Sequence, residues 1–484
     1  MSRWSGRRDW AHPVVRVVVV GALSAAVVLG VDRLGAVPGD AAPQGAGKQV
    51  AATSVTAYCP GDPFTDRSEV EVTGQVSAHA APSTVLDGVV TPDDEPGEIS
   101  IRDLAADRSS DTDQDEKPTS GRPDVVEDEL DGPMRVRARW HHAPGAVMSQ
   151  SFVAGGERAT GLAAVPCTAP TADAWLVSGG AEDGRQEQLV LTNPGANAVS
   201  VTVDALGAKG DESVVVPPRD RSIVLLDAIG GTDAPQAVHV TSSNGLIVPT
   251  IVDHHLDGLT PAGVETSVPT TSPSKRQVVP AGVDGDDQGI VLAAPGGSDA
   301  VVQVRSLGED GPRSSSVETV PAGSAVDLDL PEQEPGVHGW LVESDEPVVA
   351  AAHLTTRASD GTRDMAWSVA TTAIRSLGGV ALPTETGGQV TRSVSITADE
   401  TSTAEVLALR DGTVTAQEVS LDAGHSTAVP VGAAEAVWVR PTSGSVHAAA
   451  LLVGDDGASR ARAASVPIES SRVAVRDIEV VHQR

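Results

Sequence analysis

Short apolar runs separated by polar residues and turn formers recur through most of the chain. They are clearest between Gln188 and His255, where Val, Ile and Leu dominate each run. In the run 199–203, three valines alternate with Ser200 and Thr202. Such alternation sends one set of side chains to a core and the other to water, as in a half-buried β-strand. The pattern predicts a series of short strands joined by tight turns.

The same pattern returns further along the chain. The segment 189–195 is matched by 289–296, about 101 positions later, and in this register Trp340 aligns with His239. A third copy follows about 98 positions further on, and there Trp438 aligns with Trp340. About seven strands in roughly 100 residues are typical of an antiparallel, immunoglobulin-like β-sandwich. We therefore predict an all-β chain of tandem sandwiches; the alternative is a β-propeller-like closed array.

The repeats and the segments before them divide the chain into seven parts. The predicted parts are a cytoplasmic N-terminus (1–12), a transmembrane anchor (13–34), a flexible tether (35–50), a degenerate β unit (51–170) with a disordered acidic insert (87–131), and three β repeats (171–279, 280–382 and 383–484).

The N-terminal apolar run from Val14 to Val31 is long enough to cross a membrane. About 18 residues at roughly 1.5 Å each make a helix of about 27 Å, close to the thickness of a bilayer core. Arg3, Arg7 and Arg8 precede it, and positive charge of this kind stays in the cytoplasm. We expect a single-pass membrane protein with its bulk outside the cell membrane. Cleavage of the segment as a signal peptide remains the alternative.

Cys59 and Cys167 are the two cysteines of the chain. In an oxidising, exported compartment such a pair is expected to form a disulfide. Closing a loop of this length would stabilise the fold by on the order of 4 kcal/mol. Two buried free thiols or a metal-binding pair are the alternatives, although no histidine has ligand spacing to either cysteine.

The formal net charge of -32 makes nucleic acid an unsuitable partner, because like charges repel. The insert 87–131 holds 16 acidic and 4 basic residues, a composition that predicts disorder. Within it, 111–115 resembles the start of a calcium loop. Glu116 and Arg122 then stand where such a loop needs Gly and Glu. We expect a solvated acidic loop there.

Few residues suggest catalysis. Ser426 lies in Gly-His-Ser-Thr-Ala, which resembles the nucleophile elbow of hydrolases, but the repeat places it after a strand-to-strand turn with no helix behind it. His141 with His142, and His254 with His255, are the densest histidine sites, and the repeat register does not bring them into one ligand set. We expect no enzyme activity, no cofactor and no bound metal.

Trp340 and Trp438 share a position in the repeat. Equivalent aromatic residues on a strand predict a plug between two sheets. The alternative is a pair of ligand-stacking platforms for sugars.

Two motifs resemble those of known surface proteins. Trp175 to Gly180, followed by Leu191-Thr-Asn-Pro-Gly195 and the segment 240–243, is similar to the Trp and Asn-Pro-Gly β repeats of bacterial surface proteins. With one N-terminal anchor and two cysteines in the first unit, the chain resembles an actinobacterial family of membrane-anchored, extracytoplasmic proteins of unknown function. That resemblance implies a compartment and carries no catalytic residues.

These observations favour a non-enzymatic protein of the bacterial cell envelope with a structural or interaction role. Cell-wall glycan or other envelope proteins are the expected partners. A carbohydrate-binding array using Trp340 and Trp438 is the first alternative, and an extracellular hydrolase based on Ser426 is the second.

Overall fold

The structure is a computed structural model that describes residues 49–64, 69–106, 124–180, 183–208, 210–230, 235–280, 287–329, 336–359, 361–455 and 461–476. The predicted anchor (13–34) and the loop 111–115 that resembles a calcium site lie outside these residues. Among the described residues no helix is long and apolar enough to span a membrane. Residues Gln49–Val475 form one compact unit.

Four consecutive groups of strands make up this unit, as the alternating runs predict. The first group contains β2 (Ser54–Cys59), β3 (Glu71–His79), α2 (Ser83–Leu86), β4 (Glu98–Asp103), β5 (Val125–Glu129), β6 (Met134–Arg139), η3 (Trp140–His142), β7 (Val147–Gly155) and β8 (Gly161–Pro166). The second contains β9 (Asp173–Ser178), β10 (Arg185–Asn193), β11 (Val199–Ala205), β12 (Glu212–Val216), β13 (Asp220–Leu225), α3 (Leu226–Ile229), β14 (Gln236–Ser242), β15 (Val248–Asp257) and β16 (Thr260–Ser267).

The third group contains β17 (Ser274–Val279), β18 (Asp287–Ala294), β19 (Ala300–Gly308), β20 (Gly311–Val320), β21 (Ser324–Asp329), β22 (Val337–Arg357) and β23 (Arg363–Val369). The fourth contains β24 (Gly378–Ala381), β25 (Gln389–Ala398), β26 (Ser402–Arg410), β27 (Thr413–Leu421), β28 (His425–Pro430), β29 (Ala436–Ser443), β30 (His447–Asp455) and β31 (Ala461–Ile468). Two short strands, β1 (Gln49–Ala51) and β32 (Ala474–Arg476), lie outside the four groups.

Each group is a sandwich of two antiparallel sheets, which confirms the all-β prediction. In the second group the inner sheet has the order β13-β10-β15-β16 and the outer sheet β12-β11-β14-β9. The fourth group repeats this order as β28-β25-β30-β31 and β27-β26-β29-β24. In the third group the long strand β22 belongs to both sheets. The first group has a three-stranded outer sheet, β2-β6-β4.

The cores lie between the two sheets of each sandwich. In the second sandwich, Leu189 and Leu191 of the inner sheet pack with Val201, Val203 and Val238 of the outer sheet, and all five side chains are almost completely buried. The alternating valines of 199–203 point into this core, as their period predicts.

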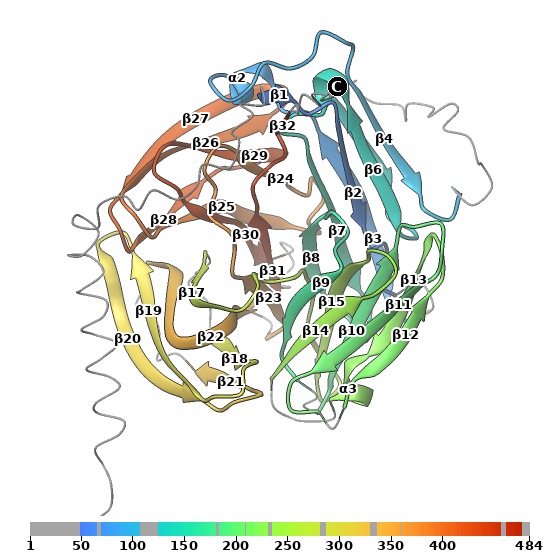
Figure 1. Cartoon of the computed structure of the whole chain (residues 1–484), viewed down its shortest axis with the longest axis vertical. Helices are drawn as coiled ribbons and strands as arrows, with labels where there is room; N and C mark the ends of the chain where they lie inside the picture. The colour runs from blue at the N-terminus through green and yellow to red at the C-terminus, as the bar shows by residue number, and fades with distance from the viewer. Residues whose placement is uncertain are drawn as a thin grey trace, which may run out of the picture. The chain divides into compact units, whose positions relative to one another are not determined.

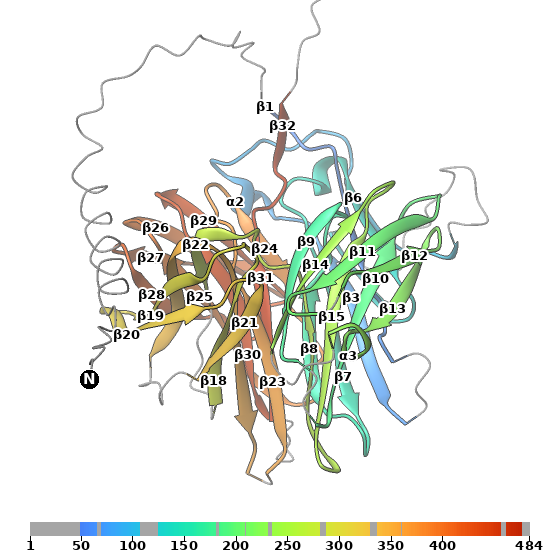
Figure 2. The same cartoon turned by 60° about the horizontal axis from the view of Figure 1, so that its bottom comes forward.

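The four sandwiches are arranged in a ring (Figures 1 and 2). The last strands of the sandwiches, β8, β16, β23 and β31, contact one another in a cycle, so that each lies beside the next and β31 lies beside β8. We call these four strands the axial strands. The ring differs from a β-propeller because each unit is a two-sheet sandwich, whereas a propeller blade is a single sheet.

Strand pairing moves two of the predicted boundaries. β17 lies before position 280 but pairs with β22 of the third sandwich, and β24 lies before position 383 but pairs with β29 of the fourth. The sandwiches therefore change between β16 and β17 and between β23 and β24. The apolar runs alone did not show to which sheet a strand at a boundary would pair.

The prediction that the whole acidic insert is disordered is wrong. β4 pairs with β6, and β5 pairs with β3. In β4, Ile99 and Ile101 are buried and alternate with polar residues, which is sufficient to form a half-buried strand despite the surrounding acidic residues. Residues 107–123 of the insert lie outside the described part of the chain.

Candidate functional site

The axial strands meet around one buried carboxylate, that of Asp364 at the start of β23. Its oxygens accept backbone N–H groups from all four axial strands: Leu162 (2.9 Å), Val264 (3.3 Å), Met365 (3.0 Å) and Ala463 (2.8 Å). Each axial strand is the edge of its inner sheet, and an edge strand carries N–H groups that need an acceptor. Asp364 supplies that acceptor to four edges at once.

The positions equivalent to Asp364 explain why its side chain fits. The residues that precede the four N–H donors are Gly161, Gly263, Asp364 and Arg462. A Cβ atom on Gly161 would lie 2.6 Å from the Asp364 carboxylate, and one on Gly263 would lie 2.8 Å from the backbone nitrogen of Met365. Two strands therefore give up a side chain at this level so that a third can place its carboxylate at the centre.

A second carboxylate, that of Glu265 on β16, lies next along the axial strands. Burial raises its pKa well above the usual range, although backbone N–H groups of Thr266, Ser465 and Ala164 lower it and the Asp364 charge raises it. The Thr266 N–H donates to the Glu265 carboxylate (2.8 Å). The backbone N–H groups that lower its pKa lie on three of the four axial strands, two residues further along each strand than the donors to Asp364.

Burial also raises the pKa of Asp364 to about 8, opposed by the backbone N–H groups of Leu162, Ala463 and Met365 and by the Arg462 guanidinium. Asp364 and Glu265 are both fully buried. These two acids are closed to solvent, so they hold the ring together and do not form a surface site for chemistry.

The buried ion pair of Arg185 and Asp253, together with Trp367, joins the second and third sandwiches. Arg185 Nε donates to Asp253 (2.9 Å), and the indole N–H of Trp367 donates to the same carboxylate (2.9 Å). Burial acts to raise the pKa of Asp253, but the Arg185 guanidinium lowers it below its usual value. Nearby, burial and the Asp253 charge raise the pKa of Glu187 to about 8.

A surface cleft lies where the first and last sandwiches meet. Its volume is about 620 Å³, within the range of small-ligand sites. One wall is β2, and the others are the segments that follow β8 (166–170) and β31 (467–472). Leu246 of the second sandwich stands at its rim and is 48% exposed. We call this space the closure cleft.

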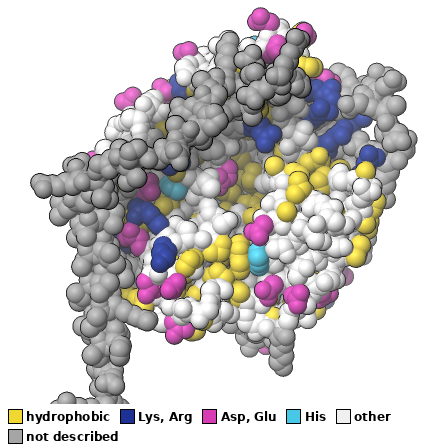
Figure 3. Space-filling view, viewed as in Figure 1, with side chains coloured by type: hydrophobic (Ala, Val, Ile, Leu, Met, Phe, Trp, Pro, Cys, Tyr) yellow, Lys and Arg dark blue, Asp and Glu magenta, His cyan; other side chains and the backbone are white. Residues whose placement is uncertain are grey.

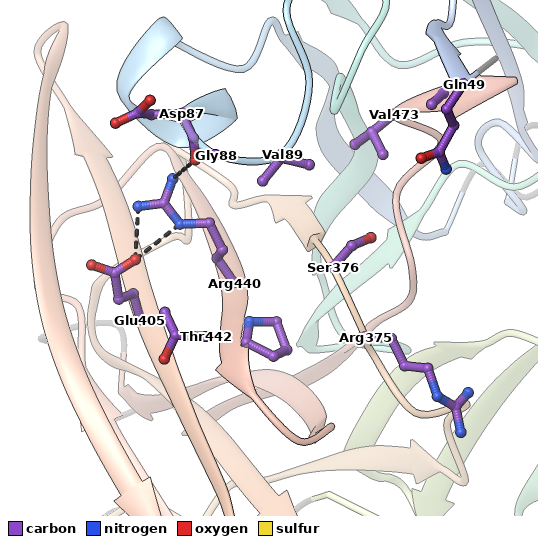
Figure 4. Close-up of a pocket in the computed structure, with 12 residues that line it drawn as sticks. Gln49, Asp87, Gly88, Val89, Arg375, Ser376, Glu405, Arg440, Thr442 and Val473 are labelled. Atoms are coloured by element: carbon purple, nitrogen blue, oxygen red, sulfur yellow. Dashed lines mark hydrogen bonds and ion pairs between the residues drawn. The ribbon is translucent and has the colours of Figure 1, made fainter.

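Another cleft, of about 500 Å³, lies between α2 and the outer sheet of the fourth sandwich. Figure 4 shows Arg440 between the Glu405 carboxylate and the turn that ends α2. The Arg440 guanidinium bonds Glu405 (2.9 and 2.7 Å) and the carbonyls of Thr84, Val85 and Asp87 (3.1, 3.0 and 2.8 Å). Arg440 therefore fixes α2 to the fourth sandwich and is not free to bind a ligand.

Basic side chains gather on the outer sheet of the first sandwich, in contrast to the acidic chain as a whole. Arg135, Arg137 and Arg139 alternate along β6 with buried residues, and Arg102 lies on the neighbouring strand β4. Figure 3 shows dark-blue side chains at the upper right, where Figure 1 places β4 and β6. Arg137 also donates to the Ser54 hydroxyl (3.3 Å).

The sugar-stacking hypothesis for Trp340 and Trp438 is not supported, because the two side chains are 1% and 0% exposed. Trp340 lies in the core of the third sandwich, whereas Trp438 points to the opposite face of its sheet and packs with Val85 and Leu86 of the α2 region. The two tryptophans are thus one residue out of register in the fold, and a shift of one residue reverses the face of a strand. The indole N–H of Trp438 donates to the Gly145 carbonyl (2.8 Å), which joins the last sandwich to the first.

The remaining candidate residues have structural surroundings. Ser426 is fully buried on β28, where its hydroxyl bonds Thr397 (2.8 Å) and the carbonyl of Ile396 (3.0 Å). Cys59 and Cys167 form the predicted disulfide, which joins β2 to the segment after β8.

The histidine pairs do not form a metal site among the described residues, where no group of three or more potential ligands occurs. His141 bonds the carbonyl of Asp93 (3.0 Å) and His254 bonds the carbonyl of Arg158 (2.7 Å).

The arrangement defines a disulfide-linked, all-β protein whose sandwiches close around buried acids, with the closure cleft between the first and last sandwiches. Residues 120–432, well over half of the chain, match the Family of unknown function (DUF5719), and the chain belongs to this family. No curated protein matches it. The predicted membership of a family of unknown function is confirmed. An actinobacterial origin stays a prediction.

The sequence reasoning missed the axial acids and the closure cleft. The signal for the acids was present, because Gly161, Gly263, Asp364 and Arg462 recur at close to the repeat offset. No single motif marks the cleft, whose walls come from three distant segments of the chain.

Proposed function

We propose that this chain is a non-enzymatic interaction protein of the bacterial cell envelope, held outside the membrane by residues 13–34. The observation that carries the proposal is the Cys59–Cys167 disulfide, since such bonds persist in exported proteins and are rare in the cytosol. The apolar run 14–31 behind three arginines supplies both the export signal and the anchor.

The surroundings of the candidate residues support an interaction role. Ser426 is packed inside a sandwich, and the axial acids are closed to solvent. The closure cleft is open to solvent, and apolar and small polar residues make up most of its lining, with Glu469 and Arg472 among them. It is the surface that best fits binding of a small partner segment.

Reporter fusions test the compartment and the anchor. Alkaline phosphatase, which needs export to become active, is fused after Arg484, and an epitope tag is placed before Ser2 of the same chain. We expect the phosphatase to be active. We also expect the epitope tag and the phosphatase to appear on one band in the membrane fraction. Export would be refuted by an inactive phosphatase together with bright cytoplasmic fluorescence from a matching fusion to a fluorescent protein. The anchor would be refuted by loss of the N-terminal tag and release of the chain from the membrane.

A further inference from the structure

The closure cleft exposes a gap in the backbone pairing of β2. On one end of the gap, the Ala52 N–H donates to the Val473 carbonyl (3.0 Å). On the other end, Tyr58 and Thr168 exchange two backbone bonds (2.9 and 3.0 Å). Two segments of the chain itself therefore already pair with this edge of β2.

Between these contacts, Thr56 has backbone groups that face the cleft. Alternate residues of a strand point their N–H and C=O groups to the same edge. The Thr53 carbonyl accepts the Trp140 N–H, on the side of β6. Ala52 and Tyr58 point to the other side, and so by the same period do Ser54 and Thr56. No backbone bond joins Ser54 or Thr56, on this second side, to another residue of the described chain. Of the two residues, Thr56 lines the cleft.

Both the walls and the size of the cleft suit a short extended chain. Val55, Met148 and Leu246 supply apolar surface, and Ser470 and Ser471 supply hydroxyl groups. The distance from Ala52 to Tyr58 along a strand is about 20 Å, and the two ends are occupied, which leaves room for roughly three residues. An extended peptide of small, uncharged side chains would continue the ladder that the chain begins at both ends.

We infer that the closure cleft binds a short extended peptide segment of a partner protein, by pairing with the backbone of Thr56. This inference rests on the proposed interaction role and names the chemistry of the partner. It is independent of the membrane anchor, because failure of peptide binding would leave the results of the reporter fusions unchanged.

The test uses the purified full-length chain and the probe acetyl-Ala-Val-Ala-Val-amide carrying a fluorescent dye, with binding measured by anisotropy. Thr56→Pro removes the one N–H that faces the cleft and keeps the bonds to β6, a position where an edge strand tolerates proline. Thr56→Val is the matched control, since it changes the side chain and keeps the N–H. We expect Thr56→Pro to raise the Kd at least about tenfold and Thr56→Val to change it less than about twofold.

A second arm does not depend on the folding of a variant. The same probe with N-methyl groups on its two valines cannot donate to β2 from those positions, and we expect it to bind the wild-type chain at least about tenfold more weakly. Equal binding of the two probes, equal binding by folded Thr56→Pro, or binding of tri-N-acetylchitotriose in place of the peptide would overturn the inference.

Discussion

At the scale of single residues, Gly161 shows how the axis depends on the absence of a side chain. Its missing Cβ leaves the space taken by the Asp364 carboxylate, 2.6 Å from where a methyl group would lie. An added methyl group would have to displace either the strand that carries it or a buried carboxylate with four hydrogen bonds. Either displacement costs free energy. Substitutions at this position therefore act on all four sandwiches.

We expect Gly161→Ala to lower the free energy of unfolding by about 1–3 kcal/mol, the usual effect of overpacking a tight core. Urea unfolding followed by tryptophan fluorescence measures it. Gly155→Ala is the control, because Gly155 ends β7 with nothing within 4 Å of its added Cβ. Equal stability of the two variants would mean that Gly161 is not packed against the carboxylate as described.

The raised pKa of Asp364 predicts a dependence of stability on pH. The folded pKa is about 8 and the ordinary value is 3.8, so the folded chain binds more protons than the unfolded chain between these values. The contribution of Asp364 to the free energy of unfolding must then fall as pH rises from about 4 to about 8. Glu265, whose pKa is also raised, acts in the same direction.

The variant Asp364→Asn does not titrate at this position. Its amide also brings N–H donors into a site that already holds four backbone N–H groups. We expect the wild type to exceed Asp364→Asn in free energy of unfolding by more at pH 5 than at pH 8. Urea unfolding at the two pH values, with the exposed Asp204→Asn as control, gives the comparison. A difference that stays constant or widens with pH would contradict the assignment.

At the scale of elements, the sequence predicted most strands and placed some of them wrongly. The Asn-Pro-Gly turn after β10 was interpreted as a structural motif, and Asn193 indeed bonds the carbonyls of Asn197, Val216 and Pro217 (2.9, 3.1 and 3.0 Å). The helix α2 was missed because its four residues carry too little helical period to be seen. The shared register of Trp340 and Trp438 was wrong by one position, since Val437 and Val439 take the core positions of β29 and Trp438 lies on the other face.

The contact of α2 with the fourth sandwich gives a prediction of its own. Arg440→Lys keeps the charge, but a lysine cannot bond Glu405 and three carbonyls together, because it lacks the planar fork of arginine. We expect amide hydrogen exchange over residues 82–90 to become at least about tenfold faster, while the sandwich cores keep their protection. Arg410→Lys on β26 is the control, since Arg410 is 66% exposed and pairs with Asp411 at the surface. Unchanged exchange over 82–90 would show that Arg440 does not fix α2.

At the scale of the whole molecule, repetition predicted similar sandwiches but not how they close. Hydrophobic period reports which side of a strand is buried, and every sandwich satisfies it separately. Closure depends instead on contacts between distant positions, such as Trp438 with Gly145 and Asp364 with Leu162. The disulfide was predictable because the chain has two cysteines and a predicted export segment. The two axial acids lie on β16 and β23, and the N–H groups around Asp364 come from four strands spread over about 300 residues.

The ring closed on Asp364 is the central claim, and hydrogen–deuterium exchange of the axial strands tests it most directly. Peptides covering Leu162, Val264 and Ala463 should exchange slowly in the wild type, although each strand is the edge of its inner sheet. In Asp364→Asn we expect all three to exchange faster together, while peptides from the outer strands β11 and β26 stay unchanged. Fast exchange of the three peptides in the wild type, or acceleration of β23 alone in the variant, would contradict a ring joined at one carboxylate.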